Sequence, residues 1–414
     1  MNRVVITGMG AVTPLGNDVQ TFWSNLIAGK SGAARITRFN PDLFRTQFAC
    51  EVKGFDAAEY LDKADIRKTD LFNQYALSAA GQAIKESGFD MSTIDPLDVG
   101  VIIGSGQGGM QTFEDQVKDY AANNFVPRFS PFFVTKLISN MAPGMLSIKH
   151  GFMGINYTTV SACSTSNTAI MDAFNYIRLG KAKIIVTGGA EAPITEASFG
   201  GFCSMKAMSI RNDDPATASR PFDVTRDGFV MGEGAGILVL EDYEHAKARG
   251  AIIHAELVGA AMTADAYHIT SPHPEGVGAY HGMRLALKDA SMNADEVDYL
   301  NAHATSTPVG DMSEIAAISK LFGNAPANLS VSGTKSATGH LLGGAGAIEA
   351  VASIMSIKNN IVPPTINTTE LDPQVPKTLD IVIGKAMEKK VNVAMSNTFG
   401  FGGHNGIVVF KRMN

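Results

Sequence analysis

Short apolar runs alternate with stretches of helical periodicity along most of the chain. Runs of three to five mostly apolar residues, often with Gly inside or just after them, are typical of strands buried on both faces of a sheet. We place such strands at residues 4–7, where a glycine turn ends the run, and at 99–103, 158–160, 184–187, 237–240, 297–300, 329–331 and 391–394. Residues 71–87 instead repeat apolar side chains at helical spacing. Strands separated by helices predict an α/β fold with a substantially parallel sheet.

The order of these segments indicates a divergent internal duplication. Segments 99–109, 160–174 and 184–202 run strand–turn, strand–small-residue helix and strand–Gly-rich turn, and the same order recurs at 297–311, 331–351 and 392–403. The spacing between matching segments differs, and two unrelated α/β halves would also look similar, so the alternative of no duplication stays open. A charged stretch at 241–251 lies where a boundary would fall. We therefore expect two halves, residues 1–250 with a candidate nucleophile and residues 251–414 with two candidate histidines.

Composition and charge narrow the class of protein. Of 414 residues, 45% are hydrophobic and 18% charged, which is typical of a globular chain and not of a disordered one. The formal net charge of −6 argues against nucleic acid as a partner. The three cysteines form no CxxC pair, so we expect a reducing compartment and neither a disulfide framework nor a zinc site. No apolar run reaches about 18 residues, so we expect a soluble cytoplasmic enzyme without a membrane span.

Cys163 stands in the most informative segment of the chain. A β-branched strand runs into Ala-Cys-Ser-Thr-Ser and then into a helical pattern, which places a thiol at a strand-to-helix turn. The free N–H groups of a helix N-terminus favour a thiolate, so we expect a lowered pKa and a nucleophile. A buried structural cysteine is the alternative, and we assign it to Cys50 and Cys203, which lack this context.

Two of the nine histidines have the surroundings that a cysteine nucleophile needs. His303 follows an apolar strand among small and hydroxyl residues, and His340 lies in a Gly-rich segment shortly after Lys335. Both occupy strand-to-loop ends, where α/β folds gather catalytic groups. No HExxH motif occurs, so a metal site built on these histidines is not favoured.

A glycine motif elsewhere resembles a nucleotide-binding loop. Gly104, Gly106 and Gly109 match GxGxxG after a strand. The continuation offers no second strand that ends in an acidic residue about 20 positions later. We therefore do not expect a dinucleotide cofactor.

Cys163, His303, Lys335, His340 and the tail SNTFGFGGHN together resemble the β-ketoacyl-acyl-carrier-protein synthases, and most closely the elongating type II enzymes of bacterial fatty-acid synthesis. The resemblance extends from VVITGMGAVTPLG near the start to the tail, and includes residues 219–236 and NAHATSTPVGD. It implies a thiolase-like fold, in which two pseudo-duplicated halves form a five-layer α-β-α-β-α sandwich. It also implies a homodimer that acts on acyl and malonyl carrier protein.

The resemblance implies a decarboxylating Claisen condensation. Cys163 would take an acyl chain as a thioester, and the enolate formed by loss of CO2 from malonyl carrier protein would attack it to release 3-oxoacyl carrier protein. The N–H groups of Cys163 and Phe399 would hold the tetrahedral intermediate, and neutral His303 and His340 would hold the enolate oxygen. No external cofactor would be needed.

Further roles follow from the same resemblance. Lys335 and Glu349 would form a buried ion pair that orients the site, and Asp311 would be structural. Phe399, beside Gly400, would gate the acyl pocket. The expected substrate-binding residues are Phe399, Thr305, Thr307, Gln107, Phe202 and Ser271. A structural Na⁺ or K⁺ would lie near Asn301, Glu349, Ser396 and Asn397.

Two positions depart from the common pattern of the family. Gln107 stands where an aliphatic residue often lines the base of the acyl pocket, and a polar group there costs about 1–3 kcal/mol if it is buried without a partner. His404 replaces the more usual Thr. These departures leave open an alternative, a specialised ketosynthase of a polyketide- or polyene-like pathway with a different acyl-chain preference.

Three other kinds of protein fit less well. A degradative thiolase would use a second cysteine near the C-terminus, and none follows Cys203. A non-catalytic partner subunit would lack the nucleophile, whereas Cys163 is present. A protein that only binds a ligand would not need the whole set of motifs.

We also expect a local basic patch, because carrier proteins are acidic and the chain as a whole is not basic. The candidate docking residues are Lys63, Arg67, Lys68, Lys206 and Arg211. They come from two segments that are far apart in the sequence, so the patch requires the fold to bring them together.

Overall fold

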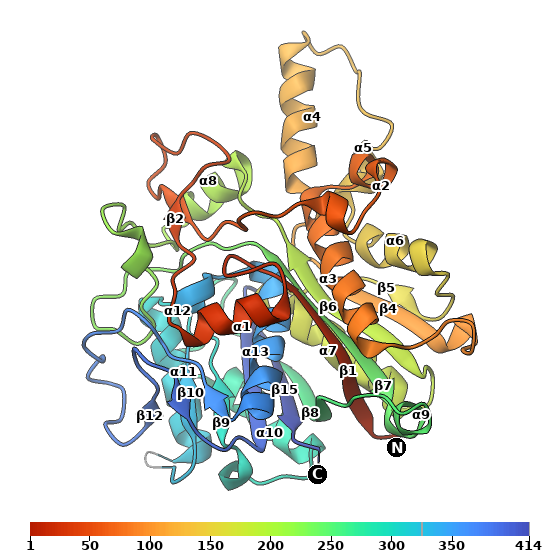
Figure 1. The fold of residues 1–414 in the computed structure, drawn as a ribbon. Coiled ribbons are helices and arrows are strands. Elements are labelled where there is room, and N and C mark those ends of the chain that lie inside the picture. Colours follow the sequence, from red (N-terminus) through yellow and green to blue (C-terminus); the bar gives the residue numbers. More distant parts are fainter. Residues whose placement is uncertain (324–325, 414) are drawn as a thin grey trace.

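The computed structural model describes residues 1–323 and 326–413 (Figure 1). Its main feature is an eleven-stranded mixed sheet with the order β12-β10-β9-β14-β15-β8-β1-β7-β6-β4-β5. The strands are β1 (Val4–Val12), β4 (Val99–Gly104), β5 (Asn156–Tyr157), β6 (Ile184–Glu191), β7 (Gly234–Asp242), β8 (Ala255–Ala264), β9 (Tyr299–Asn301), β10 (Ser330–Ser332), β12 (Asp380–Ile381), β14 (Val393–Gly400) and β15 (His404–Lys411). Two small ribbons pair β2 (Ala34–Arg35) with β3 (Phe48–Ala49), and β11 (Ile361–Val362) with β13 (Met387–Glu388).

The helices cover and separate the two parts of this sheet. They are α1 (Val19–Ile27), α2 (Lys63–Lys68), α3 (Leu71–Ser87), α4 (Met110–Ala122), α5 (Phe133–Leu137), α6 (Met141–His150), α7 (Thr165–Arg178), α8 (Glu196–Ser204), α9 (Tyr243–Ala248), α10 (Val277–Asp289), α11 (Pro308–Phe322), α12 (Lys335–Thr338) and α13 (Ala345–Asn359). Two short 3-10 turns, η3 (Ala162–Ser164) and η6 (Leu342–Gly344), directly precede α7 and α13. These two turns carry much of the site described below.

The two halves of the sheet repeat one topology. The first five main strands lie in the order β5-β4-β6-β7-β1, and the next five lie in the matching order β10-β9-β14-β15-β8. Within each half the first three strands of this order are parallel, and the last two are antiparallel to their neighbours. The halves meet where β1 pairs with β8 over only three residue pairs. This pseudo-symmetric arrangement is the duplicated fold that the motif order predicts.

The layers follow from which helix faces are apolar. Helix α3 packs on one side of the first half, against β1 and β7, and α10 packs on the second half, against β8 and β15. Helices α7 and α13 lie between the halves (Figure 1). Every residue of α13 from Ala345 to Ile357 is buried, because a helix with a sheet on either side has no face toward water. The result is the expected five-layer α-β-α-β-α sandwich.

The structure corrects several expected element boundaries. Strand β1 does not end at residue 7 but continues to Val12. A side chain at Gly8 or Gly10 would collide with backbone carbonyls of α3, so these glycines admit the helix instead of forming a turn. The expected strand at 158–160 is displaced to β5, and the sheet is more antiparallel than expected because β1, β7, β8 and β15 run antiparallel to their neighbours. Strands β8 and β15 were not predicted.

One part of the fold stands away from the sandwich. Helix α4 and the segment that leads into α5 form an arm that projects from the body (Figure 1). The arm exposes Phe113, Phe125, Phe129 and Val134 by 42, 66, 43 and 61%. In the described residues, no helix has both the length and the apolar composition needed to cross a bilayer.

Candidate active site

A cavity of about 360 Å³ opens where the carboxyl ends of strands from both halves meet. It is lined by nine of the residues singled out in the sequence, Cys163, Phe202, Lys206, Ser271, His303, Thr305, Thr307, His340 and Phe399. The nucleophile candidate comes from the first half and both histidines come from the second. The fold therefore brings together groups that are up to 236 positions apart in the chain.

Cys163 lies in η3, immediately before α7, with 8% of its surface exposed. The preceding residue, Ala162, has a positive φ of 50°, a strained value for a residue with a side chain. This sharp turn lifts the thiol out of the helix axis and into the cavity, as the sequence predicts.

The expected lowering of the Cys163 pKa is not what the structure shows. Burial raises the pKa of the thiol to about 12, and the Lys335 charge and the Phe401 backbone N–H offset only part of that effect. The cost of burying a thiolate thus exceeds the stabilisation that the lysine charge and the backbone N–H groups of Phe401 and Cys163 provide. At neutral pH the resting nucleophile is a thiol.

This pKa predicts the pH dependence of alkylation. Because only the thiolate reacts, alkylation of Cys163 by iodoacetamide is expected to speed up about tenfold per pH unit from pH 7 to 9, without a plateau. The rate is measured by mass spectrometry of the Cys163 peptide, and Cys163→Ser gives the blank. A plateau below pH 8 contradicts the raised pKa.

The second backbone donor at the thiol differs from the expected one. Phe399 lies inside β14 opposite Asn405, and its ring packs 5.5 Å from that of His303. The backbone N–H that acts on the Cys163 thiol belongs to Phe401, two residues later. The ring of Phe401 also packs 6.3 Å from that of Phe202. The donor role assigned to Phe399 therefore passes to Phe401, because the chain leaves the β14 ladder only after Gly400.

His303 and His340 face each other across the cavity. Their ring centroids are 5.3 Å apart with planes at 89°. Burial, followed by the Lys335 charge, holds both pKa values well below the usual range for histidine. Both rings are therefore neutral at pH 7, and each has one N–H to donate.

Lys335 and Glu349 form an ion pair with both side chains 1% exposed. Burial raises the pKa of Glu349 to about 7 despite the lysine charge. Lys335 is not among the residues that line the cavity. Its charge nevertheless lowers the pKa values of Cys163, His303 and His340. Lys335 therefore affects the electrostatics of the site without lining the cavity.

Two acidic side chains on α11 hold the loop that carries His303. Glu314 accepts hydrogen bonds from the N–H groups of His303 and Ala304 at 2.9 and 2.8 Å. Asp311 accepts from the N–H of Ser306 at 3.0 Å, and burial raises its pKa to about 7. Glu314 was not predicted from the sequence. The available signal was a carboxylate set among apolar residues on a buried helix face.

Gln107 has a partner for its polar group. Its Oε1 accepts a hydrogen bond from the Ser198 hydroxyl at 2.7 Å, so the cost of an unpaired polar atom does not arise. Gln107 is not among the residues that line the cavity. Its neighbourhood is α8, whose residue Phe202 does line it.

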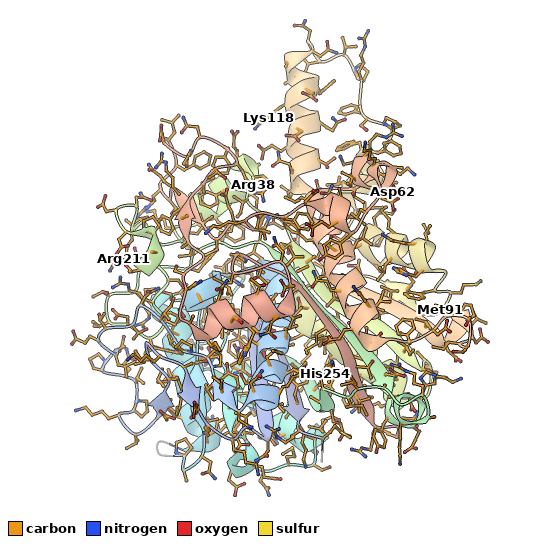
Figure 2. All side chains as sticks on the ribbon, viewed as in Figure 1. Arg38, Asp62, Met91, Lys118, Arg211 and His254 are labelled. Carbon is orange, nitrogen blue, oxygen red and sulfur yellow. The ribbon has the colours of Figure 1, made fainter. Side chains whose placement is uncertain are left out.

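The two segments that carry the candidate docking residues do not come together within one chain. Lys63, Arg67 and Lys68 belong to α2, which Asp62 caps, whereas Lys206 and Arg211 follow α8. Figure 2 places Asp62 and Arg211 on opposite sides of the molecule. Within a single chain, the expected common patch is therefore two separate patches, of which only Lys206 borders the cavity.

Three residues of the expected cation site have buried oxygen atoms without partners. Glu349 Oε2, Ser396 Oγ and Asn397 Oδ1 are buried and have no hydrogen-bond partner among the described residues. Asn301, beside Ser396 in the adjacent strand, bonds to Thr334. An oxygen-only donor set with one carboxylate suits a hard cation, so these residues fit the expected Na⁺ or K⁺.

Two family models match the chain, the N-terminal domain of beta-ketoacyl synthase over residues 1–246 and the C-terminal domain over 254–369. The chain belongs to the beta-ketoacyl synthase family. It is 48% identical over 410 residues to the 3-oxoacyl-[acyl-carrier-protein] synthase 2 of Synechocystis sp. strain PCC 6803, covering 99% of this chain and 98% of the relative. The enzyme of the same name from Staphylococcus aureus strain COL is 49% identical over 413 residues, with the same coverage.

The fold of this beta-ketoacyl synthase has solved counterparts. The structure of AntDE with AntF, a type II polyketide acyl-carrier protein in complex with its ketosynthase, matches it with a TM-score of 0.92 and 31% identity, covering all of both chains. The identity to that polyketide ketosynthase is much lower than the identity to the two 3-oxoacyl synthases.

Proposed function

We propose that the cavity elongates acyl chains by decarboxylating condensation of a Cys163 thioester with malonyl carrier protein, giving 3-oxoacyl carrier protein. The observation that carries this is the meeting of a buried thiol with two neutral imidazoles in one cavity. A thiol is the group that holds an acyl chain as a thioester, and paired N–H donors suit an enolate oxygen. Near full-length relatives named 3-oxoacyl-[acyl-carrier-protein] synthase 2 support elongation in fatty-acid synthesis over a specialised pathway.

The proposed roles follow from the environment of each group. The neutral Cys163 thiol attacks the carbonyl of the incoming thioester, and its proton passes to the carrier-protein thiolate that leaves, while Lys335 and the Phe401 N–H stabilise the Cys163 sulfur. The backbone N–H groups of Cys163 and Phe401 then receive the oxyanion of the tetrahedral intermediate. His303 and His340 donate to the enolate that loss of CO2 leaves behind. Loss of CO2 drives the step, so no redox or nucleotide cofactor takes part.

A bound Na⁺ or K⁺ would rigidify the floor of this site. The ion would be held by Glu349, Ser396, Asn397 and Asn301. Its positive charge would stabilise the buried oxygen atoms that lack hydrogen-bond partners. Glu349 and Asn397 also bond to Lys335 and Glu314, so the same residues connect this floor to both catalytic histidine loops.

Acyl transfer to Cys163 is the direct test of this function. Incubation with an acyl carrier protein is expected to add one acyl group, and peptide mapping is expected to find it on Cys163 alone. Cys203 is the internal control, because it is partly exposed on α8 next to the cavity residue Phe202. Adding malonyl carrier protein then yields the 3-oxoacyl product. An adduct on Cys50 or Cys203, or none on Cys163, contradicts the proposal.

We infer two carrier-protein docking regions, Lys206 at the mouth of the cavity and the exposed cations of α2. A carrier protein in complex with the ketosynthase AntDE supports this kind of partner. The phosphopantetheine arm would enter between Thr305 and Thr307 on one wall and Ser271 on another, because all three line the cavity. Rim charges act mainly on association, so their effect falls as salt rises.

Charge reversal on α2 tests the docking surface. Arg67→Glu with Lys68→Glu is expected to raise KM for the carrier-protein substrate about tenfold at low salt, and to leave turnover of a small acyl-coenzyme A analogue unchanged. The matched control is Arg284→Glu with Lys288→Glu on α10, which changes the charge equally at exposed positions on another helix. Equal loss with both substrates removes α2 from the docking surface.

We also propose a cytoplasmic homodimer. Strand β5 is one of the two edge strands of the sheet, and Val160, three residues after it, is 62% exposed. The projecting arm adds Phe113, Phe125 and Phe129 to the exposed apolar surface, which a second copy of the chain would cover. The free cysteines suit a reducing compartment.

A further inference from the structure

Glu191, the last residue of β6, is fully buried, and in the described part of the chain its carboxylate forms hydrogen bonds to a hydroxyl and to backbone N–H groups but to no basic side chain. One carboxylate oxygen accepts from the Ser105 hydroxyl and the Gln107 N–H at 2.9 and 3.0 Å. The other accepts from the N–H groups of Gly106 and Gly343 at 2.8 and 3.0 Å. Four donors converge on one group and favour its ionised form, which offsets part of the rise in the Glu191 pKa that burial causes.

The donors come from both halves of the fold. Ser105, Gly106 and Gln107 follow β4, whereas Gly343 belongs to η6, three residues after His340. A Cβ added at Gly106 or Gly343 would lie 2.8 or 2.5 Å from Glu191 Oε2. Only glycine lets the two backbones approach the carboxylate this closely.

This explains the GxGxxG motif that is not a nucleotide site. Gly106 admits the Glu191 carboxylate, Gly104 admits the side chain of Thr165, and Gly109 admits the carbonyl of Lys136. Successive backbone N–H groups of this kind form a concavity for an anion. Here the anion is a side chain of the same protein, in the place where a phosphate would bind in a nucleotide-binding loop.

Gly343 connects Glu191 to the segment that carries Cys163 through two hydrogen bonds of its backbone. Its N–H donates to Glu191, and its carbonyl accepts a hydrogen bond from Ser166, three residues after Cys163. Turns η3 and η6 are also in direct contact. On its other side, the backbone of His340 is bonded to Val230 and Gly232. The turn between His340 and α13 is therefore fixed through Glu191 and Ser166 together.

We propose that Glu191 is a positioning residue of the condensation, whose carboxylate holds the 105–107 loop and the turn after His340 at a set distance from Cys163. The proposal rests on the proposed function of this cavity. It assigns to Glu191 no contact with the substrate. Its effect reaches the reaction through the relative placement of the thiol and the His340 imidazole, which effective catalysis requires to within a fraction of an ångström.

The Glu191 charge also acts on the thiol directly, because it raises the pKa of Cys163 while Lys335 lowers it. His303 and His340, which share the cavity, are neutral. Removing the Glu191 charge is therefore expected to favour the thiolate. A loss of local packing alone has no such directed effect.

The test uses Glu191→Gln in the full-length protein. The amide places a donor against at least one of the backbone N–H groups, so we expect kcat to fall about tenfold while KM for the carrier protein stays within twofold. The pH profile of Cys163 alkylation is expected to move to lower pH by about half a unit. Hydrogen exchange is expected to speed up in peptides that contain residues 105–107 and 342–344.

Glu241→Gln is the matched control. Glu241 is equally buried, but it lies on the neighbouring strand β7 and pairs with Ile184, the first residue of β6, at the end of that strand far from Glu191. It bonds to Arg249, His245 and Thr7. This variant is expected to lower the melting temperature and to leave kcat, the alkylation profile and exchange in both loops unchanged.

A second variant separates the effect of the carboxylate charge from the effect of the side-chain length. Glu191→Asp keeps the charge but is one methylene shorter, so it is expected to lose kcat without the shift in the alkylation profile; it also serves if the Gln variant does not fold. The proposal is overturned if the Glu191→Gln variant has the same kcat and the same hydrogen exchange in both loops as the Glu241→Gln variant. If the wild-type protein forms no 3-oxoacyl product, the proposed function fails, and alkylation and loop exchange still decide whether Glu191 positions these loops.

Discussion

Replacing either His303 or His340 by Ala is expected to lower the rate of malonyl carrier protein decarboxylation by about 100- to 1,000-fold, while Cys163 is still acylated. The two steps use different groups, because the thioester forms at Cys163 and the Phe401 N–H, whereas the enolate needs the imidazole donors. Both rings are held neutral by burial, so each supplies a hydrogen bond and not a charge.

Release of labelled CO2 and the mass of the Cys163 peptide measure the two steps separately. His281→Ala is the control, because His281 is exposed on α10 and lies outside the cavity. A variant of His303 or His340 that decarboxylates at the wild-type rate shows that the histidine concerned has another role. A variant that also loses acylation shows that the two steps are not divided in this way.

Replacing Lys335 by Met is expected to lower the free energy of unfolding by about 3–5 kcal/mol at pH 8, because it leaves the buried Glu349 carboxylate without its cation. The effect depends on pH. The folded pKa of Glu349 is raised to about 7, above its unfolded value near 4.3, so its ionisation already costs stability as pH rises through this range. Without Lys335 the folded pKa rises further, and the loss is larger at pH 8 than at pH 6.

Urea unfolding at the two pH values measures this difference. The double variant Lys335→Met with Glu349→Gln is expected to recover most of the loss and to remove the added pH dependence. Lys183→Met is the matched control, since Lys183 pairs with Asp98 at 2.7 Å but is 54% exposed, and it should cost under about 1 kcal/mol. A Lys335→Met loss that is equal at both pH values contradicts an ionised, paired Glu349.

Much of the secondary structure was predictable where one local signal dominated. Helix α3 has the predicted bounds, 71–87, since its apolar spacing, its Asp70 cap and its Gly88 terminus agree. Strand β1 was predicted too short because its glycines look like a turn locally, whereas they make room for α3. Strands β8 and β15 were not predicted. Strand β15 begins directly after a Gly-rich turn, and the glycines favoured the interpretation of this segment as a loop.

The site shows the same division. Cys163, His303 and His340 were identifiable because each stands in an unusual local pattern of small residues at a strand end. Glu191 and Glu314 were not, because a single carboxylate among apolar residues indicates at most a buried acid and does not indicate which groups it contacts. Their roles consist of bonds to backbone N–H groups of other segments, which depend on the distance between loops.

The sequence by itself determined the α/β class, the order of the motifs, the resemblance to the ketosynthases and the candidates for the reacting groups, because these depend on residue type and local spacing. The tertiary structure decided the pKa values and protonation states of those groups. Burial, which local sequence does not encode, raises the pKa of the Cys163 thiol that its helix terminus alone would lower. It also keeps both imidazoles neutral. Only the folded chain places the Phe401 N–H at the thiol. It also leaves the two basic segments apart (Figure 2). Both outcomes depend on where distant loops lie in space.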